Sequence, residues 1–266
     1  MSFSISGKTA IVTGAANGIG LAVARHFSDK GANVMCADMD EDRLADQLGG
    51  TAEDGNIRYF AGDLRQRLTI ANLVSATIDA FDQVDILVNA SRQVIMTDAL
   101  DPEDNSVEVL IEQNLMTALR LSQYVARRMI KQSGEEGEGS AGSIINLSSI
   151  AANQPRPELL GYSIASAGLE QMTRGLALSL APNRIRVNAV AFGSVMSASL
   201  KDAIKDQPDW RQAIEDHTPL RRIASPTELV DAVQFLSSDG SAFVTGEILK
   251  VDGGRSLLDP VAAPAH

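Results

Sequence analysis

The chain has 266 residues, of which 44% are hydrophobic and 21% charged, as in an ordinary globular domain with one sizeable core. Its formal net charge of -11 argues against nucleic acid as a partner, because surfaces that bind nucleic acid are basic. The N-terminus lacks the basic and apolar regions of a signal peptide, and no apolar run approaches the ~20 residues needed to cross a bilayer, so we expect no membrane partner.

Short apolar runs alternate along the chain with longer segments of helical periodicity. Nearly continuous apolar runs are typical of parallel strands buried on both faces, and they occur at 9–14, 32–38, 57–63, 84–90, 143–148, 185–191 and 246–254. Helical periodicity occurs at 18–31, 67–81, 106–132, 162–181 and 225–238. The alternation predicts an α/β fold, a doubly wound parallel sheet of the Rossmann type, in a single domain over residues 1–256.

Three stretches do not fit this alternation. Residues 134–142 are rich in glycine and glutamate, which predicts a flexible surface loop. A polar stretch with two prolines follows the sixth expected strand, and we expect it to form a helical lid, at about 194–218, over the binding edge of the sheet. Residues 257–266 are expected to be a loose C-terminal tail.

The segment TGAANGIG, residues 13–20, follows the first expected strand and opens the first expected helix. Gly14, Gly18 and Gly20 permit a tight turn and let the backbone come close to a ligand. The start of the helix offers unpaired N–H groups and a partial positive charge, which suit a pyrophosphate. This placement favours a dinucleotide site, formed with Asn17 and Ile19, over a plain structural turn.

Asp38 closes the second expected strand, eighteen residues after Gly20. A carboxylate at that point can accept hydrogen bonds from both ribose hydroxyls of an adenosine, and it repels a 2′-phosphate. Asn17 and its neighbours add no cation that would offset this repulsion. We therefore expect NAD in preference to NADP as the cofactor; the alternative is a solvated aspartate at a strand end.

With these motifs the chain resembles the short-chain dehydrogenase/reductase family over roughly residues 5–256. The matching positions are the glycine-rich loop, Asp63 and Leu64 in AGDL, Asn89 and Ala90 in DILVNA, Asn114 in IEQNLMTAL, Ser149 thirteen residues before Tyr162, and Gly193 and Val195 in RVNAVAFGSVMS. The resemblance implies that the AGDL segment meets the adenine and that the last segment wraps the nicotinamide.

The resemblance also implies a reaction. Tyr162 would exchange a proton with the substrate oxygen while the nicotinamide takes or gives a hydride; Ser149 would orient that oxygen, and Asn114 would support a water relay. The substrate would be a small alcohol or carbonyl compound. Helices around 106–132 and 162–181 would join subunits into a homo-oligomer, a dimer or a tetramer.

The active-site segments depart from the family pattern in three places. The family lysine four residues after the tyrosine binds the nicotinamide ribose and stabilises the phenolate, and Ser166 stands in its place. Ser166 carries no charge, although its hydroxyl can still hydrogen-bond a ribose hydroxyl. The family motif Asn-Asn-Ala-Gly reads Asn-Ala-Ser-Arg here, so that Arg92 replaces a glycine beside the cofactor, and Phe192 replaces a proline of the nicotinamide segment.

Two hypotheses remain open for Arg92. It reaches into the space left by the lysine, restores a positive charge near Tyr162 and grips the cofactor; or it points elsewhere or fills the cleft, and the catalytic system has decayed. The function predicted is an NAD-dependent oxidoreductase that interconverts an alcohol and a ketone or aldehyde, with Tyr162 as acid and base. The alternative is an impaired or silent homologue that binds a nucleotide or a partner subunit as a sensor or structural protein.

The sequence predicts no catalytic metal. The three histidines, His26, His217 and His266, have no ligand spacing with one another or with the single cysteine, Cys36. Because Cys36 is alone, no disulfide can form within the chain. This fits a reducing compartment, and we expect a cytoplasmic protein.

Overall fold

The computed structural model of the protein describes residues 3–49, 55–134 and 139–259. In this part of the chain seven strands form one parallel sheet in the order β3-β2-β1-β4-β5-β6-β7. The strands are β1 (Thr9–Thr13), β2 (Asn33–Asp38), β3 (Ile57–Ala61), β4 (Ile86–Asn89), β5 (Gly142–Ser149), β6 (Ile185–Phe192) and β7 (Ile248–Val251). The predicted doubly wound α/β fold is confirmed, and its topology places a binding crevice where the strand order reverses, at the carboxyl ends of β1 and β4.

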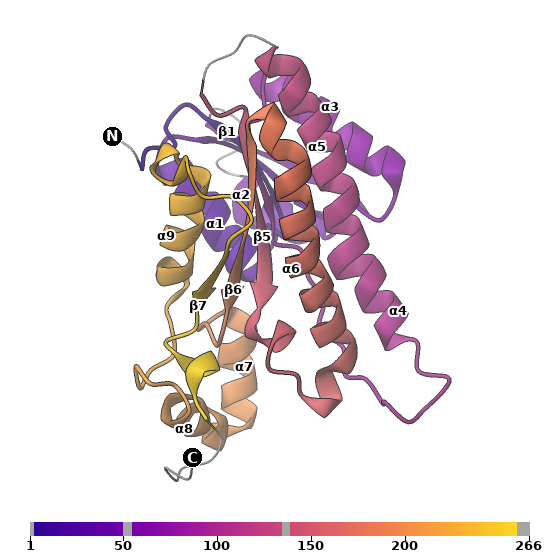
Figure 1. Cartoon of the computed structure of the whole chain (residues 1–266), viewed down its shortest axis with the longest axis vertical. Coiled ribbons are helices and arrows are strands. Elements are labelled where there is room, and N and C mark those ends of the chain that lie inside the picture. Colours follow the sequence, from indigo (N-terminus) through magenta and orange to yellow (C-terminus); the bar gives the residue numbers. More distant parts are fainter. Residues whose placement is uncertain (1–2, 50–54, 135–138, 260–266) are drawn as a thin grey trace.

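Alternate side chains of the central strands point into two separate apolar cores. On β1, Val12 packs into the core under α1 (Gly18–Asp29) and α9 (Pro226–Ser237), whereas Ile11 packs into the core on the opposite face. That second face is covered by three helices: α3 (Arg67–Phe81), α5 (Thr117–Ser133) and α6 (Leu160–Leu180) (Figure 1). Both β1 side chains are fully buried, as the continuous apolar pattern of a strand covered on two faces requires.

The observed helices differ from the expected ones in two ways. The helix α2 (Glu41–Leu48) was not expected; it is short and charged and buries only Leu44 and Leu48. Its signal is Asp40, whose carboxylate accepts a hydrogen bond from the Arg43 N–H and caps the helix. The helix expected at 106–132 is divided into α4 (Ser106–Leu110), the π-helix η2 (Ile111–Met116) and α5.

The polar stretch expected to form a lid contains two helices, α7 (Ala198–Asp206) and α8 (Pro208–Asp216). They lie beyond the carboxyl ends of β6 and β7 (Figure 1). A bridge between Val195 and Ala224 joins the two ends of this stretch, and the Met196 N–H donates to the Ala224 carbonyl at 2.9 Å. That these helices act as a lid stays a prediction.

Two expected segments are only partly described. Residues 135–138 of the expected loop and 260–266 of the expected tail lie outside the described residues, and Leu257 ends the short turn η7 (Arg255–Leu257). No helix of the described residues is both long enough and apolar enough to span a membrane.

Cys36 on β2 is fully buried, and burial raises the pKa of its thiol to about 12. Because the thiolate is the reactive form, we expect iodoacetamide at pH 8 to leave the native protein unlabelled and to label it in denaturant, where a cysteine titrates near 8.5. The raised pKa contributes stability that is complete below about pH 8.5 and is lost as the pH rises toward 12. Rapid labelling of the native protein in a mass-spectrometric assay would contradict the burial of this side chain.

Candidate active site

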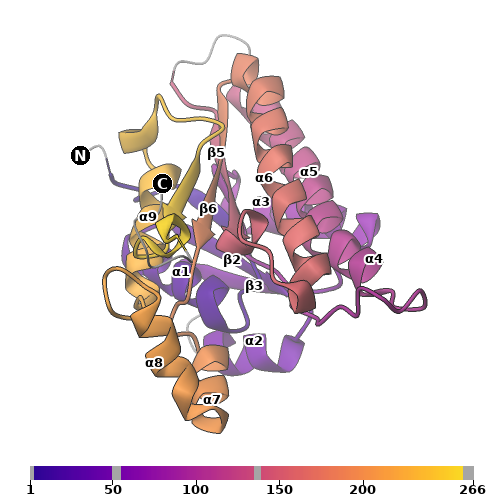
Figure 2. The ribbon, with the colours of Figure 1, turned by 60° about the horizontal axis from the view of Figure 1, so that its bottom comes forward.

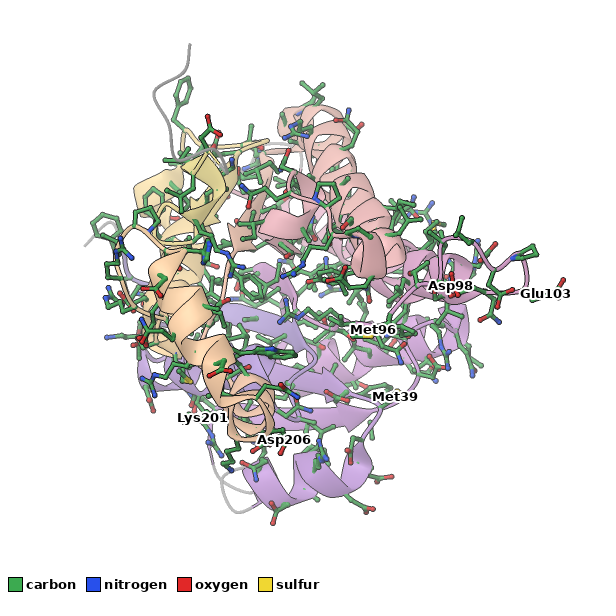
Figure 3. All side chains as sticks on the ribbon, turned by 90° about the horizontal axis from the view of Figure 1, so that it is seen from below. Met39, Met96, Asp98, Glu103, Lys201 and Asp206 are labelled. Atoms are coloured by element: carbon green, nitrogen blue, oxygen red, sulfur yellow. The ribbon has the colours of Figure 1, made fainter. Side chains whose placement is uncertain are left out.

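A cleft of about 560 Å³ opens at the carboxyl ends of the central strands. Ten of the residues that the sequence singled out line it: Gly14, Asn17, Gly18, Ile19, Gly20, Asp38, Asp63, Leu64, Ala90 and Arg92. Seen from below in Figure 3, Met39 and Met96 lie between α7, marked by Lys201 and Asp206, and the loop marked by Asp98 and Glu103. Met39, which lines the cleft, is 65% exposed, and Met96 is 73% exposed.

Each of the three positions in the first loop is occupied by glycine for its own physical reason. A Cβ on Gly14 would lie 2.8 Å from the Ser91 Cα, and a Cβ on Gly20 would lie 2.1 Å from the Gly14 carbonyl oxygen. Both glycines therefore permit close backbone packing. Gly18 has φ +56 and no atom within 4 Å of a built Cβ, so it faces open space on the cleft wall, where a ligand can come close to its backbone.

The N-terminus of α1 is left free for an anion. Asn17 stands at the N-cap with extended backbone angles, yet its side chain caps no N–H group, and the first turn holds no acidic residue. The first N–H groups of a helix have no partner within the helix. The end of α1 therefore offers donors and a partial positive charge to the cleft, which suits a pyrophosphate.

Asp38 is held rigidly at the end of β2. Its carboxylate accepts backbone N–H bonds from Ala16 at 3.1 Å, Met39 at 2.7 Å and Asp40 at 3.2 Å. A carboxylate has about four acceptor positions, so capacity remains for a ligand hydroxyl. The contact with Ala16 also fixes the glycine loop against β2.

Asp63 does not lie free in the cleft wall. Arg65 donates to it from Nε and Nη2 at 2.8 to 3.1 Å, and these hydrogen bonds are the largest cause that lowers the pKa of the Asp63 carboxyl. Arg65 also lines the cleft, a role that the sequence analysis missed. Its signal was the cation two residues after the motif aspartate, in GDLRQR.

Arg92 points at the tyrosine. Its Nη1 donates to the Tyr162 hydroxyl oxygen at 3.1 Å, and its guanidinium carbon lies 4.5 Å from the centre of the Phe192 ring, in cation–π range. An arginine side chain has five N–H donors. Among the described residues, Arg92 forms one hydrogen bond with these donors, the bond to Tyr162. The guanidinium is therefore placed by two protein groups and still has donors for a ligand.

The backbone on both sides of Arg92 is fixed. The N–H groups of Ala90 and Ser91 both donate to the Thr13 hydroxyl at 3.0 Å. After Arg92, the Asn114 amide accepts from the Gln93 N–H and donates to the Gln93 carbonyl, both at 2.8 Å. Asn114 thus clamps the loop that carries Arg92, and its expected support of a water relay stays a prediction. It lies in the π-helix η2, a distortion that is frequent at functional sites.

Tyr162 and Ser166 lie one turn apart on the same face of α6, at 7% and 6% exposure. Together with Arg92, Asn114 and Asn89 they line a cavity of about 10 Å³, room for about one water molecule. Arg92 therefore approaches the tyrosine beside the position where the family carries its lysine. Ser166 and Arg92, the two residues that depart from the expected pattern, line the same cavity.

Ser149 ends β5, and its hydroxyl accepts the Ala151 N–H at 3.1 Å, which caps the short turn η3 (Ile150–Ala152). In the parallel register Ser149 is paired with Phe192, the last residue of β6. The ends of these two strands thus bring Ser149 next to the residue on which Arg92 stacks, and α6 packs against η3.

Three expected cofactor residues do not line the cleft. Asn89 is buried and donates to Ser122 and to Asn146, which makes it part of a polar network within the fold. The backbone N–H of Gly193 donates to the Val251 carbonyl at 3.2 Å, and Val195 packs into the core beneath α9. A contact of these three residues with a cofactor stays a prediction.

Further residues that the sequence analysis did not assign to the cofactor line the cleft: Ala37, Met39, Gly62, Arg65, Ser91, Gln93, Val94, Gln113 and Ser197. Most are neighbours of predicted residues along the chain, and Gln113 comes from η2. In the described ranges no group of three or more histidine, cysteine or acidic side chains is arranged to hold a metal ion.

Known proteins share this fold and much of this sequence. Residues 14–256 match a family model described as enoyl-(acyl carrier protein) reductase. A glucose 1-dehydrogenase from Gluconobacter oxydans is 32% identical over 254 residues, 95% of this chain and 93% of that protein. The crystal structure of a putative short-chain alcohol dehydrogenase from Sinorhizobium meliloti superposes with a TM-score of 0.88, at 27% identity over 97% of this chain and 100% of that one.

A further solved structure is similar to this chain and contains ligands. It is a 7α-hydroxysteroid dehydrogenase complexed with NADH and 7-oxo glycochenodeoxycholic acid, with a TM-score of 0.86 and 30% identity over 95% of this chain and 96% of that one. The similarity to these proteins extends over nearly the whole length of the chain.

Proposed function

The chain belongs to the short-chain dehydrogenase/reductase family and is an oxidoreductase of that family, and from this premise we propose that it interconverts an alcohol and a ketone or aldehyde with NAD. Tyr162 is the acid and base, and Arg92 takes the electrostatic role of the missing lysine. The observation that supports this most is the 3.1 Å hydrogen bond from Arg92 to the tyrosine oxygen.

The residues of the cleft fit a dinucleotide. The free N-terminus of α1 and the open space at Gly18 suit the pyrophosphate, and Asp38 suits a ribose with two hydroxyls. When bound, the nicotinamide supplies the hydride chemistry of the reaction.

In the direction of alcohol oxidation, the deprotonated Tyr162 oxygen accepts the proton of the substrate hydroxyl, and the carbon of the same group gives up a hydride, which the nicotinamide of bound NAD would accept. The guanidinium of Arg92 stabilises the phenolate that accepts this proton, because an opposite charge at hydrogen-bond distance favours the charged form of a group. Ser149 donates to the substrate oxygen and fixes its position. In the reverse direction Tyr162 returns the proton to the alkoxide.

We expect NADH to bind at least about ten-fold more tightly than NADPH, equivalent to about 1.4 kcal/mol, because Asp38 would face a 2′-phosphate. Two cationic side chains line the cleft, Arg65 and Arg92. Arg65 forms an ion pair with Asp63, and Arg92 is bonded to Tyr162, so neither is expected to offset the repulsion of that phosphate by Asp38. Titration calorimetry with both nucleotides measures the preference, and Asp38→Ser should reduce it. Equal binding of both nucleotides would contradict the assignment of NAD, and binding of neither would favour the silent homologue that is the alternative.

A homo-oligomer is part of the proposal. Ile164 and Leu178 on α6 are 42% and 80% exposed, and an apolar helix face left exposed favours contact between subunits. Sedimentation velocity measures this, and a monomer at micromolar concentration would contradict it. The substrate is a small alcohol or carbonyl compound, and the expected location is the cytoplasm.

A further inference from the structure

A second guanidinium lies at the carboxyl end of β6, and the proposed reaction does not use it. Arg255 opens the turn η7, directly after β7, and its Nη1 donates to the Ser194 hydroxyl at 2.9 Å. Ser194 follows Phe192 by two residues. Two guanidinium groups therefore lie at the end of β6: Arg92 stacks on the ring of Phe192, and Arg255 donates to the hydroxyl of Ser194.

Arg255 has no salt-bridge partner among the residues that the structure describes. Its side chain is partly buried, and within the described part of the chain it forms no ion pair. The nearest acid by sequence, Asp252, is already occupied by the backbone N–H groups of Gly254 and Ser256. A half-buried guanidinium that is bonded only to a neutral hydroxyl keeps donors and charge for an anion.

The surroundings of Arg255 carry charges of both signs. Burial is the largest cause that lowers the pKa of its guanidinium, repulsion by Arg156 is the next, and attraction by Asp252 opposes both. Arg156 belongs to the loop between Ser149 and Tyr162, and it is 63% exposed in an ion pair with Glu158. Figure 2 shows η7 and the η3 turn that begins this loop on either side of the end of β6. An anion between these two segments would relieve the repulsion.

The distance to the reacting groups suits a short substrate. Ser149 and Phe192 are register partners on neighbouring strands, roughly 5 Å apart, and Ser194 is two residues further, roughly 7 Å of extended chain. A molecule whose oxygen contacts Ser149 and Tyr162 can therefore reach Arg255 through a few carbon atoms.

We propose that the substrate is a short hydroxy acid and its oxo acid, with the carboxylate bound by Arg255 while the alcohol or carbonyl group lies at Tyr162. This rests on the proposed function and names its substrate class. The carboxylate takes no part in the transfer of the proton and hydride. The carboxylate orients the substrate, because one end is held by Arg255 on η7 and the reacting group lies at Tyr162 on α6.

The test uses the whole protein with NAD and a series of hydroxy acids from 2-hydroxybutanoate to 5-hydroxyhexanoate, each compared with its amide. The amide has nearly the same shape without the charge. We expect kcat/KM to be roughly 10- to 100-fold higher for at least one acid than for its amide, the size of a charge-assisted hydrogen bond. Equal values for acids and amides would overturn the proposal and leave the oxidoreductase function intact.

Variants assign the effect to its residue. In Arg255→Gln we expect KM for the acid to rise until the acid and amide have similar kcat/KM, while Arg255→Lys keeps part of the preference. Arg25→Gln, an exposed arginine on α1 bonded to Gln47, removes the same charge far from this site and should keep the whole preference. A preference that survives in Arg255→Gln would overturn the role of Arg255.

A binding measurement keeps the proposal separate from turnover. If no compound reacts although NADH binds, the proposed function fails, and the anion site is then judged from thermal unfolding of the NADH complex with each acid or amide. Stabilisation by acids alone, lost in Arg255→Gln, would support the site. Equal stabilisation by acids and amides, or none by either, would overturn it.

Discussion

Arg92→Gly should lower kcat at pH 7 by about 10²- to 10⁴-fold, the usual contribution of a positioned proton-transfer group. The variant removes the only cation that contacts the Tyr162 oxygen among the described residues. Without it the phenolate has no opposite charge nearby, because Ser166 is neutral. Steady-state kinetics with saturating NAD measure the effect, and unchanged turnover would remove Arg92 from the mechanism.

The pH profile of the same variant is a separate readout. A cation beside a proton-transfer group favours its charged form, so the activity of Arg92→Gly relative to the wild type should be lowest at neutral pH and should rise steeply toward pH 10. If the activity of Arg92→Gly relative to the wild type did not change with pH over this range, the electrostatic role of Arg92 would be contradicted. A merely structural role of Arg92 would lower activity equally at every pH.

The double variant Arg92→Gly, Ser166→Lys is the matched control. It restores the residues that the family carries at both positions, and we expect it to recover most of the lost activity. Arg92→Lys in the wild-type background should recover less, because a lysine cannot both stack on Phe192 and reach the phenol as a planar guanidinium does. Equal loss in all three variants would mean that the loop, and not the charge, is damaged.

Tyr162→Phe should reduce kcat by at least about 10²- to 10⁴-fold, since the proton would have no acceptor on the protein. The change removes one oxygen and keeps the ring, which is buried with Leu110, Ala151 and Ala165, so the fold should survive. NADH should still bind, and its dissociation constant from calorimetry should change less than about three-fold, because the cleft wall at the adenosine end is untouched.

The outcome of Tyr162→Phe separates the enzyme from the silent homologue. Loss of turnover with retained NADH binding assigns the chemistry to the tyrosine oxygen. If wild type and variant both bind NADH and neither turns over any alcohol or carbonyl compound at pH 7 to 10, the catalytic system has decayed, and the protein acts through nucleotide binding alone.

Arg92 and Phe192 form a contact with each other. From the family resemblance we expected a glycine and a proline at these two positions, and neither of those residues could form it. The guanidinium lies 4.5 Å from the centre of the Phe192 ring, and a cation–π contact of an exposed arginine is worth about 0.5 to 1 kcal/mol. The Phe192 ring and the Tyr162 hydroxyl together hold the Arg92 side chain in one direction. Ordering this long side chain costs conformational entropy, which the two contacts offset.

Features that depend on local sequence pattern could be predicted before the structure was known. Continuous apolar runs identified the strands, because each strand is covered on both faces. The glycine spacing at Gly14, Gly18 and Gly20 predicted a tight turn before a helix, and these glycines do line the cleft; that the loop binds the cofactor stays a prediction. The spacing of Ser149 and Tyr162 predicts the chemistry through the family resemblance, and the roles of these two residues stay predictions.

The directions of long side chains could not be predicted in this way, because they depend on contacts made after folding. Arg92 finds its partners on α6 and β6, seventy and one hundred residues away, and no local pattern encodes that direction. The same holds for Arg255, whose partner Ser194 is sixty-one residues earlier. The direction of a flexible cation follows from charge and contacts between distant segments, and these exist only once the sheet has brought the strand ends together.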